Sequence, residues 1–176
     1  MNRDNHYEAA FEAFLRGRGV AVMPVVEARR SYLDDAEVKS PDFLVIGPDD
    51  ARLVVDVKGR KFPGTSSGKP RLVWECWCEA DDLDGLTRWA ARLGPGYRGV
   101  LAFVYHLAPG YDLPPDTPDV FTHDGRNYLA RAVDVGDYAE LARRRSPRWK
   151  TVDLSAADYR RVVRPFTDFL AHEVAT

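Results

Sequence analysis

The sequence predicts an α/β protein in which helices flank a central mixed sheet. The first reason is the order of patterns along residues 5–107, which runs helix, strand, hairpin, helix and strand. The second is the run Gly99–Leu107, whose nearly continuous apolar character is typical of a strand buried on both faces. The third is the length of 176 residues, which suits one domain with a sizeable core. We therefore expect a single domain over residues 1–176.

The first helix is predicted over residues 5–18, because apolar side chains recur there at helical spacing and glycines follow. Glu8 lies beside the apolar stripe, so its carboxylate can reach a site beneath the helix. Glu12, one turn later, is the weaker candidate. If Asn5 is the N-cap, Glu8 instead occupies position N3 and completes a capping box. Both interpretations of Glu8 remain open at this point.

The strands that follow are short. One is expected from Val20 to Arg29, and Pro24 favours an edge position because proline donates no ladder hydrogen bond. Residues 31–40 show little periodicity and are expected to form a loop. Two β-rich runs then flank a segment of glycine, proline and aspartate, which predicts a β-hairpin. Its strands are Phe43–Ile46 and Leu53–Val57.

This hairpin carries two carboxylates and a lysine. Asp42 follows a proline ahead of the first strand, and the second strand ends in Asp56-Val57-Lys58. Because side chains alternate along a strand, Asp56 and Lys58 point to one face and Val57 to the other. A magnesium site typically uses one or two carboxylates with waters and phosphate oxygens, and a nearby lysine can orient the attacking water. The pattern therefore predicts metal-assisted phosphodiester hydrolysis.

The same residues resemble the signature of the PD-(D/E)xK nuclease superfamily, with Asp42 after its proline and Asp56 two residues before Lys58. The resemblance covers about residues 5–107 and is nearest in pattern to the Holliday-junction-resolvase-like branch. It implies a restriction-endonuclease-like fold, in which an αβββαβ core forms a central mixed sheet flanked by helices. Residues 120–174 would then be a C-terminal α/β elaboration.

The resemblance also implies roles for individual residues. Asp42, Asp56 and the first-helix Glu8 would hold Mg²⁺, with Mn²⁺ as a possible substitute, and the main-chain carbonyl of Val57 often joins such a site. Lys58 would position or help activate the attacking water. The expected activity is an endonuclease that cuts DNA in line and leaves a 5′ phosphate. A homodimer is a further expectation, because two cuts need two sites.

The rest of the chain is predicted to complete the fold. Four prolines between residues 108 and 119 exclude regular structure there. The other predicted elements are a helix from Asp81 or Asp82 to Leu93, a hairpin over residues 121–135, a helix over residues 138–145, a strand over residues 149–154 and a helix after Ser155 that is interrupted at Pro165.

Basic side chains near the motif are candidates for nucleic-acid binding. Arg60 and Lys61 follow it directly, and Lys69 lies in the Gly- and Ser-rich segment 62–70, which we expect to be a mobile loop that orders on substrate. These three residues are predicted to contact phosphates. The net charge of −2 argues mildly against broad non-specific binding, although local clustering of cations matters more than the total.

Several other conspicuous residues are expected to be structural. Trp74 and Trp77 are predicted to pack in the core or at its rim rather than to stack on bases. Cys76 and Cys78 are separated by one residue, which suits neither a disulfide nor a zinc site, so reduced thiols are expected. His106 ends a buried strand and is expected to be a structural histidine.

Targeting signals are not evident. No apolar run approaches the roughly 20 residues that a membrane-spanning helix needs, and the polar start is no signal peptide. We expect a cytoplasmic protein with no membrane partner.

Two other functions remain open from the sequence. One is a non-catalytic nucleic-acid-binding or scaffold module that retains the nuclease fold. The other is a small-molecule phosphodiesterase or transferase, which would need an enclosed pocket. The sequence also leaves open which DNA structure is cut and whether RNA is a substrate.

Overall fold

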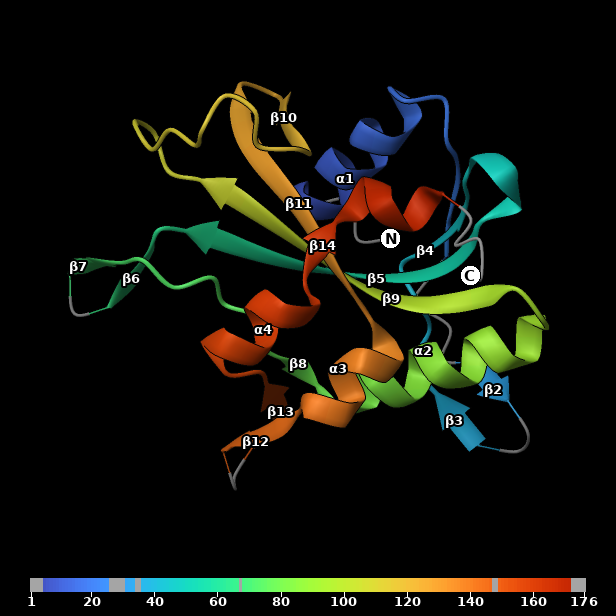
Figure 1. Cartoon of the computed structure of the whole chain (residues 1–176). Helices are drawn as coiled ribbons and strands as arrows, with labels where there is room; N and C mark the ends of the chain where they lie inside the picture. The colour runs from blue at the N-terminus through green and yellow to red at the C-terminus, as the bar shows by residue number, and fades with distance from the viewer. Residues whose placement is uncertain (1–4, 26–30, 34–35, 67, 147–148, 172–176) are drawn as a thin grey trace.

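The computed structural model describes residues 5–25, 31–33, 36–66, 68–146 and 149–171, and its centre is a seven-stranded mixed sheet (Figure 1). Strands β5 and β9 run parallel, whereas all the other pairs are antiparallel. The strands across the sheet are β1 (Ala21–Pro24), β4 (Phe43–Ile46), β5 (Arg52–Phe62), β9 (Tyr97–Leu107), β11 (Arg126–Asp134) and β10 (Val120–His123), with β14 (Arg164–Pro165) also paired to β11.

Helices cover both faces of this sheet. Helix α1 (His6–Arg16) and the 3-10 turn η2 (Phe166–Leu170) pack on one face, where Phe11, Val55 and Phe166 belong to one buried cluster. Helices α2 (Ala80–Leu93), α3 (Val135–Leu141) and α4 (Ala156–Val162) lie on the other face (Figure 1). The second cluster there includes Val54 and Leu86. Successive residues of β5 thus face opposite layers, as alternation requires.

Smaller sheets of two or three strands lie outside the central sheet. The remaining elements are the β2 (Ser31–Leu33) and β3 (Ala36–Val38) hairpin, the turn η1 (Pro48–Asp50), the β6 (Gly64–Ser66) and β7 (Lys69–Arg71) hairpin, and the sheet of β12 (Arg143–Ser146), β13 (Trp149–Asp153) and β8 (Cys78–Glu79). The β6–β7 hairpin projects away from the body of the molecule (Figure 1). No helix in the described part of the chain is long and apolar enough to cross a membrane.

The predicted core order is confirmed. Strand β1 is an edge strand, as Pro24 indicated, although it ends there; residues 26–29 of the predicted strand lie outside the described residues. The proline-rich segment 108–119 contains no helix or strand. The predicted turn of the C-terminal hairpin is also present, where Asp124 and Gly125 both have positive φ.

Four local predictions were wrong. Residues 31–38 form the β2–β3 hairpin rather than a loop, and residues 64–71 form the β6–β7 hairpin rather than a structureless loop. The arginines expected to end a helix lie in β12, because Ala142 turns to an extended conformation and the chain pairs with β13. The interruption predicted at Pro165 is present, but the last helix already ends at Val162, and the residues after Pro165 form the 3-10 turn η2 and not a continuation of that helix.

Candidate active site

Asp42 and Asp56 lie opposite each other on neighbouring antiparallel strands. Phe43 pairs with Val55, so the next position places Asp42 across from Asp56. The Asp42 amide donates to the Val55 carbonyl at 3.0 Å, and the Val57 amide donates to Asp42 Oδ2 at 2.6 Å. Each aspartate is only 3% exposed. Directly opposed side chains have Cβ atoms about 5 Å apart, so the predicted meeting of the two carboxylates is built into the strand register.

Lys58 lies between two carboxylates on this face. Its Nζ is 2.6 Å from Asp56 Oδ2 and 2.7 Å from Asp82 Oδ2. Asp82 is at position N3 of α2, where Oδ2 also accepts a hydrogen bond from the Glu79 amide at 2.7 Å, completing a capping box. The sequence predicted the cap at Asp81 or Asp82, whereas the N-cap is Glu79, and the contact of Asp82 with Lys58 was not predicted.

A second lysine, Lys39, joins the same group. Its Nζ pairs with Asp82 Oδ1 and lies 3.3 Å from Glu79 Oε2. The Lys39 carbonyl accepts a hydrogen bond from Trp89 Nε1 at 3.2 Å, and a Cβ at Gly85 would lie 2.7 Å from that carbonyl oxygen. Helix α2 therefore presses closely on the segment that leads into Asp42. Sequence analysis missed Lys39, and its only signal was its position three residues before Asp42.

The charged side chains around Lys58 shift one another's pKa values. Burial raises the pKa of Asp56 to about 6, although Lys58 counteracts the shift. Burial also opposes the charged form of Lys58, but Asp56 and Asp82 outweigh it and raise the lysine's pKa. Despite its own burial, Asp82 has a lowered pKa because Lys58 and Lys39 both stabilise its charge. At neutral pH, Asp56 is therefore mostly ionised, but a larger fraction of it is protonated than of an ordinary surface aspartate.

Glu8 is buried near the start of α1, the helix that packs on the face of the sheet opposite α2. Asn5 is the N-cap: its side chain accepts from the Tyr7 amide at 3.1 Å and donates to Glu8 Oε1 at 2.5 Å. The N-cap interpretation of Asn5 is thus confirmed. Among the described residues, no three or more His, Cys, Asp or Glu side chains are grouped closely enough to hold a metal ion. Glu8 therefore does not form such a group with Asp42 and Asp56, and its metal role stays a prediction.

The two aspartates alone nevertheless suit a hard cation. Asp56 Oδ2 is buried and, within the described part of the chain, accepts no hydrogen bond of good geometry despite its ion pair with Lys58. An oxygen in that position has capacity for a cation, and magnesium commonly takes only one or two protein carboxylates. The donor set of Asp42 and Asp56 therefore fits Mg²⁺, with the Lys58 ammonium competing for the same Asp56 oxygen.

The three predicted phosphate contacts differ in their surroundings. Arg60 donates to the Gly59 carbonyl at 2.8 Å and to the Trp77 carbonyl, and its guanidinium lies 3.9 Å from the centre of the Trp77 ring. Its guanidinium is therefore largely engaged within the protein. Lys61 and Lys69 are exposed and remain available for solvent or ligand.

The arrangement of helices and strands has a known counterpart. The fold is similar to that of Hjc from the archaeal hyperthermophile Archaeoglobus fulgidus, a Holliday junction resolvase, with a TM-score of 0.56 and 15% sequence identity. The similarity covers 94% of this chain and 98% of that one. This chain has the restriction-endonuclease-like fold. The fold expected from the PD-(D/E)xK resemblance is thus confirmed, with strands β10 and β11 added to its sheet.

No protein-family model matches the sequence, and neither does any curated protein. The restriction-endonuclease-like fold is therefore supported by three-dimensional similarity together with the local motif. In this fold the motif residues Asp42, Asp56 and Lys58 lie in the middle of the sheet, on the face that α2 covers.

Proposed function

We propose that the chain is a divalent-metal-dependent endonuclease that hydrolyses phosphodiester bonds of DNA. The observation that carries this proposal is the opposed pair of Asp42 and Asp56, with Lys58 Nζ 2.6 Å from Asp56 Oδ2. The restriction-endonuclease-like fold supports it, because that fold also occurs in a Holliday junction resolvase. Mg²⁺ is the proposed ion and Mn²⁺ its substitute.

Each residue has a proposed task. Asp42 and Asp56 would hold the ion, which supplies a water of lowered pKa and offsets negative charge on the scissile phosphate. The Val57 amide fixes the orientation of the Asp42 carboxylate through its 2.6 Å hydrogen bond. Lys58 carries a persistent positive charge within reach of Asp56, which suits it to orient the attacking water or to neutralise the phosphate.

The test is cleavage of labelled DNA substrates by the whole chain. The panel comprises linear duplex, single strand, flap and four-way junction, each with Mg²⁺, Mn²⁺ or EDTA. We expect metal-dependent cutting that Asp56→Asn abolishes and that Asp84→Asn retains, because Asp84 is an exposed residue on α2 that pairs with Arg88. Cutting that persists in EDTA or in Asp56→Asn would overturn the proposal.

One observation favours a second candidate, a nucleic-acid-binding or scaffold module without turnover. The Lys58 ammonium is held between Asp56 and Asp82, which is also how a purely structural buried ion pair is arranged. The two candidates differ in their response to metal. An enzyme should gain thermal stability with Mg²⁺, and Asp42→Ala should remove that gain. A module should bind DNA equally well with Mg²⁺ or EDTA and cut no substrate.

A further inference from the structure

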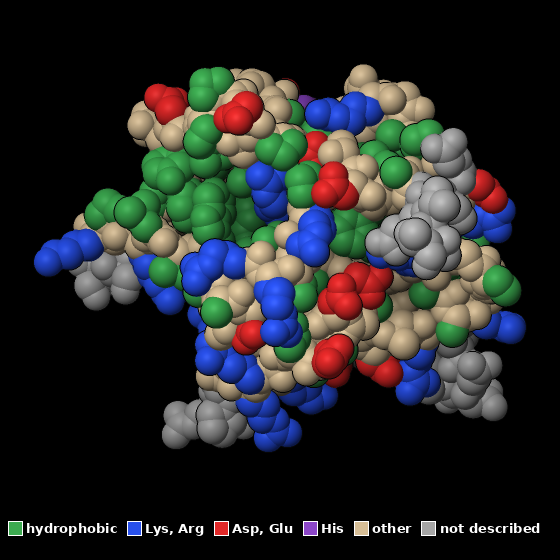
Figure 2. Space-filling view, viewed as in Figure 1, with side chains coloured by type: hydrophobic (Ala, Val, Ile, Leu, Met, Phe, Trp, Pro, Cys, Tyr) green, Lys and Arg blue, Asp and Glu red, His purple; other side chains and the backbone are tan. Residues whose placement is uncertain are grey.

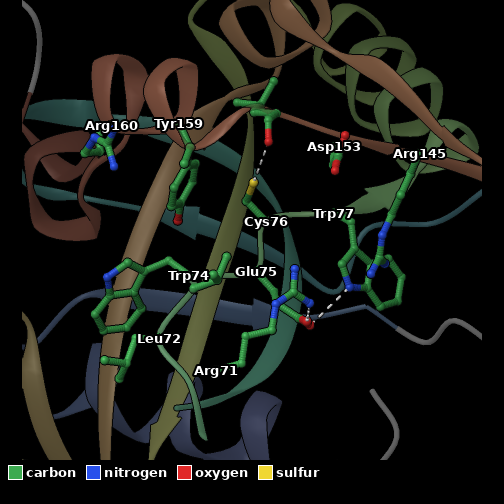
Figure 3. Close-up of a pocket in the computed structure, with 13 residues that line it drawn as sticks. Arg71, Leu72, Trp74, Glu75, Cys76, Trp77, Arg145, Asp153, Tyr159 and Arg160 are labelled. Carbon is green, nitrogen blue, oxygen red and sulfur yellow. Dashed lines mark hydrogen bonds and ion pairs between the residues drawn. The ribbon is translucent and has the colours of Figure 1, made fainter. Parts of the chain in front are cut away.

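A hollow on the second face of the sheet is lined by aromatic and basic side chains. Residues 72–77, which connect β7 to β8, have no regular structure and face α4 and β12 across a cavity of about 380 Å³. Trp74 and Trp77 lie on opposite sides of this cavity (Figure 3). A second cavity of about 210 Å³ adjoins it, and the two share Trp74, Tyr159 and Arg160. We call the two cavities together the aromatic groove.

The groove is open and partly apolar at its mouth. Leu72 is 69% exposed and Val73 is 41% exposed, which is high for large hydrophobic side chains. Figure 2 shows hydrophobic side chains gathered in a hollow beside the projecting β6–β7 hairpin, with Lys and Arg side chains to its right and below it and Asp and Glu side chains above it. Such a surface is suited to a partner that is itself partly apolar.

The charges around the groove favour an anionic partner. Both carboxylates in the lining of the larger cavity are already paired, because Glu75 lies 3.2 Å from Arg71 and Asp153 lies 3.1 Å from Arg143. Arg145 and Arg160 have no carboxylate at ion-pair distance among the described residues. The groove therefore presents flat aromatic rings and unneutralised arginines together. Planar rings attached to phosphates have the complementary chemistry.

The two tryptophans are held firmly in place. The Trp74 ring stacks on Phe62 with the ring centres 3.4 Å apart and an interplanar angle of 3°. The Trp77 ring is contacted by the guanidinium of Arg60 at 3.9 Å and by that of Arg145 at 5.1 Å. Rings fixed in this way lose little freedom when a partner stacks on them.

The residues beneath the groove and those of the candidate active site belong to the same strand, β5. Alternate residues of β5 face the same layer, so Lys58, Arg60 and Phe62 follow Asp56 on one line. Arg60 contacts Trp77 and Phe62 contacts Trp74. At about 3.3 Å per residue, Arg60 and Phe62 lie about 7 and 13 Å along the strand from Lys58. The distance from Lys58 to the groove is therefore one that a few nucleotides can span.

We propose that the aromatic groove binds unpaired bases of a nucleic-acid strand whose backbone continues to Asp56 and Lys58. This inference rests on the proposed function and extends it to a substrate class: DNA with a single-stranded segment next to the cut. Trp74 and Trp77 each pack on a residue of β5, as the sequence predicted, and both rings also line the groove.

The test measures binding in EDTA, so that it does not depend on cleavage. Whole wild-type protein is titrated into a labelled oligothymidylate of about 20 nucleotides, which exceeds a typical single-strand site, and into an abasic strand of equal length. We expect the strand with bases to bind about tenfold or more tightly, because stacking on each base adds affinity that the sugar-phosphate backbone cannot.

Variants separate the groove from general charge effects. Arg160→Glu should weaken oligothymidylate binding about tenfold, whereas Arg92→Glu, an exposed change on α2 outside the groove lining, should have little effect. Trp74→Leu should remove the preference for bases over the abasic strand. Should that variant fail to fold, the exposed Arg160→Glu change still decides the question.

Three outcomes would overturn the inference. These are equal affinity for the two strands, equal losses in Arg160→Glu and Arg92→Glu, and DNA binding that no groove variant alters, which would instead mark the groove as a contact for another protein. Failure of the proposed function has a different signature. In that case oligothymidylate binding depends on the groove, yet wild-type protein cuts no substrate with any metal.

Discussion

Lys58 of β5 and Asp82 of α2 form a buried ion pair, with Lys58 Nζ 2.7 Å from Asp82 Oδ2. The same Asp82 carboxylate caps its own helix and pairs with Lys39. One side chain therefore fixes the helix start, the motif lysine and the segment leading to Asp42. The fold and the candidate site share this residue.

The Asp82→Asn substitution should destabilise the protein by about 3 kcal/mol, because it leaves two lysines without their common buried partner. Urea unfolding measures the effect. Asp81→Asn is the matched control, since Asp81 is exposed and its Oδ2 lies 3.7 Å from Nζ of the exposed Lys150. Equal urea midpoints for the two variants would show that Asp82 contributes no more than a surface charge.

Gly59→Ala should displace α1 from the sheet. A Cβ at Gly59 would lie 2.2 Å from the Tyr7 ring, so either the ring or the helix must move. We expect a loss of about 2 kcal/mol in the free energy of unfolding, as for other overpacked positions. In a Tyr7→Ala background the same substitution should cost much less. An equal cost in both backgrounds would mean that Tyr7 is not the obstacle.

Tyr105→Phe should destabilise the protein more than Tyr159→Phe. The Tyr105 hydroxyl donates to the Glu75 carbonyl at 3.0 Å and lies 2.8 Å from the Tyr159 hydroxyl, from which it can accept. Tyr105→Phe leaves the Glu75 carbonyl and the Tyr159 hydroxyl without this partner, at a cost of about 2 kcal/mol. Tyr159→Phe removes one hydrogen bond and costs about 1 kcal/mol. Thermal unfolding of both variants ranks them, and the reverse order would contradict the assigned bonding.

Cys78 should be unreactive in the folded protein. Burial raises the pKa of its thiol from 9.0 to about 12, so the reactive thiolate is scarce at pH 8. Iodoacetamide followed by mass spectrometry should show slow labelling in buffer and fast labelling in urea. Because the folded-state pKa lies above the unfolded value, this thiol should lower the free energy of unfolding as pH rises from 9 toward 12. Rapid native labelling at pH 8 would contradict this.

The central part of the site could be predicted because it depends on local rules. Side-chain alternation along β5 places Asp56 and Lys58 on one face, and the short hairpin brings Asp42 opposite Asp56. The confirmed N-cap at Asn5 is equally local. These features are visible in a few consecutive residues.

The remaining part could not be predicted, because it depends on how distant elements pack. Asp82 has the sequence context of an ordinary helix cap, and only the position of α2 over the sheet brings it to Lys58 and Lys39. Arg60 was likewise predicted to be available for phosphates, because the sequence does not show that the segment 72–77 brings the Trp77 ring against its guanidinium. Short paired segments such as β2–β3 have too few residues to show a period.

Strand β5 and the segment 72–77 should also differ in native-state hydrogen exchange. On one side, β4 pairs with Arg52 to Val55 of β5, and on the other side β9 pairs in parallel with the whole of β5. Amides there can exchange only when the whole domain opens, whereas those of residues 72–77 can exchange through local fluctuation. The carboxylates are thus mounted on a stiff strand, while the neighbouring tryptophans are held by side-chain contacts and not by strand pairing.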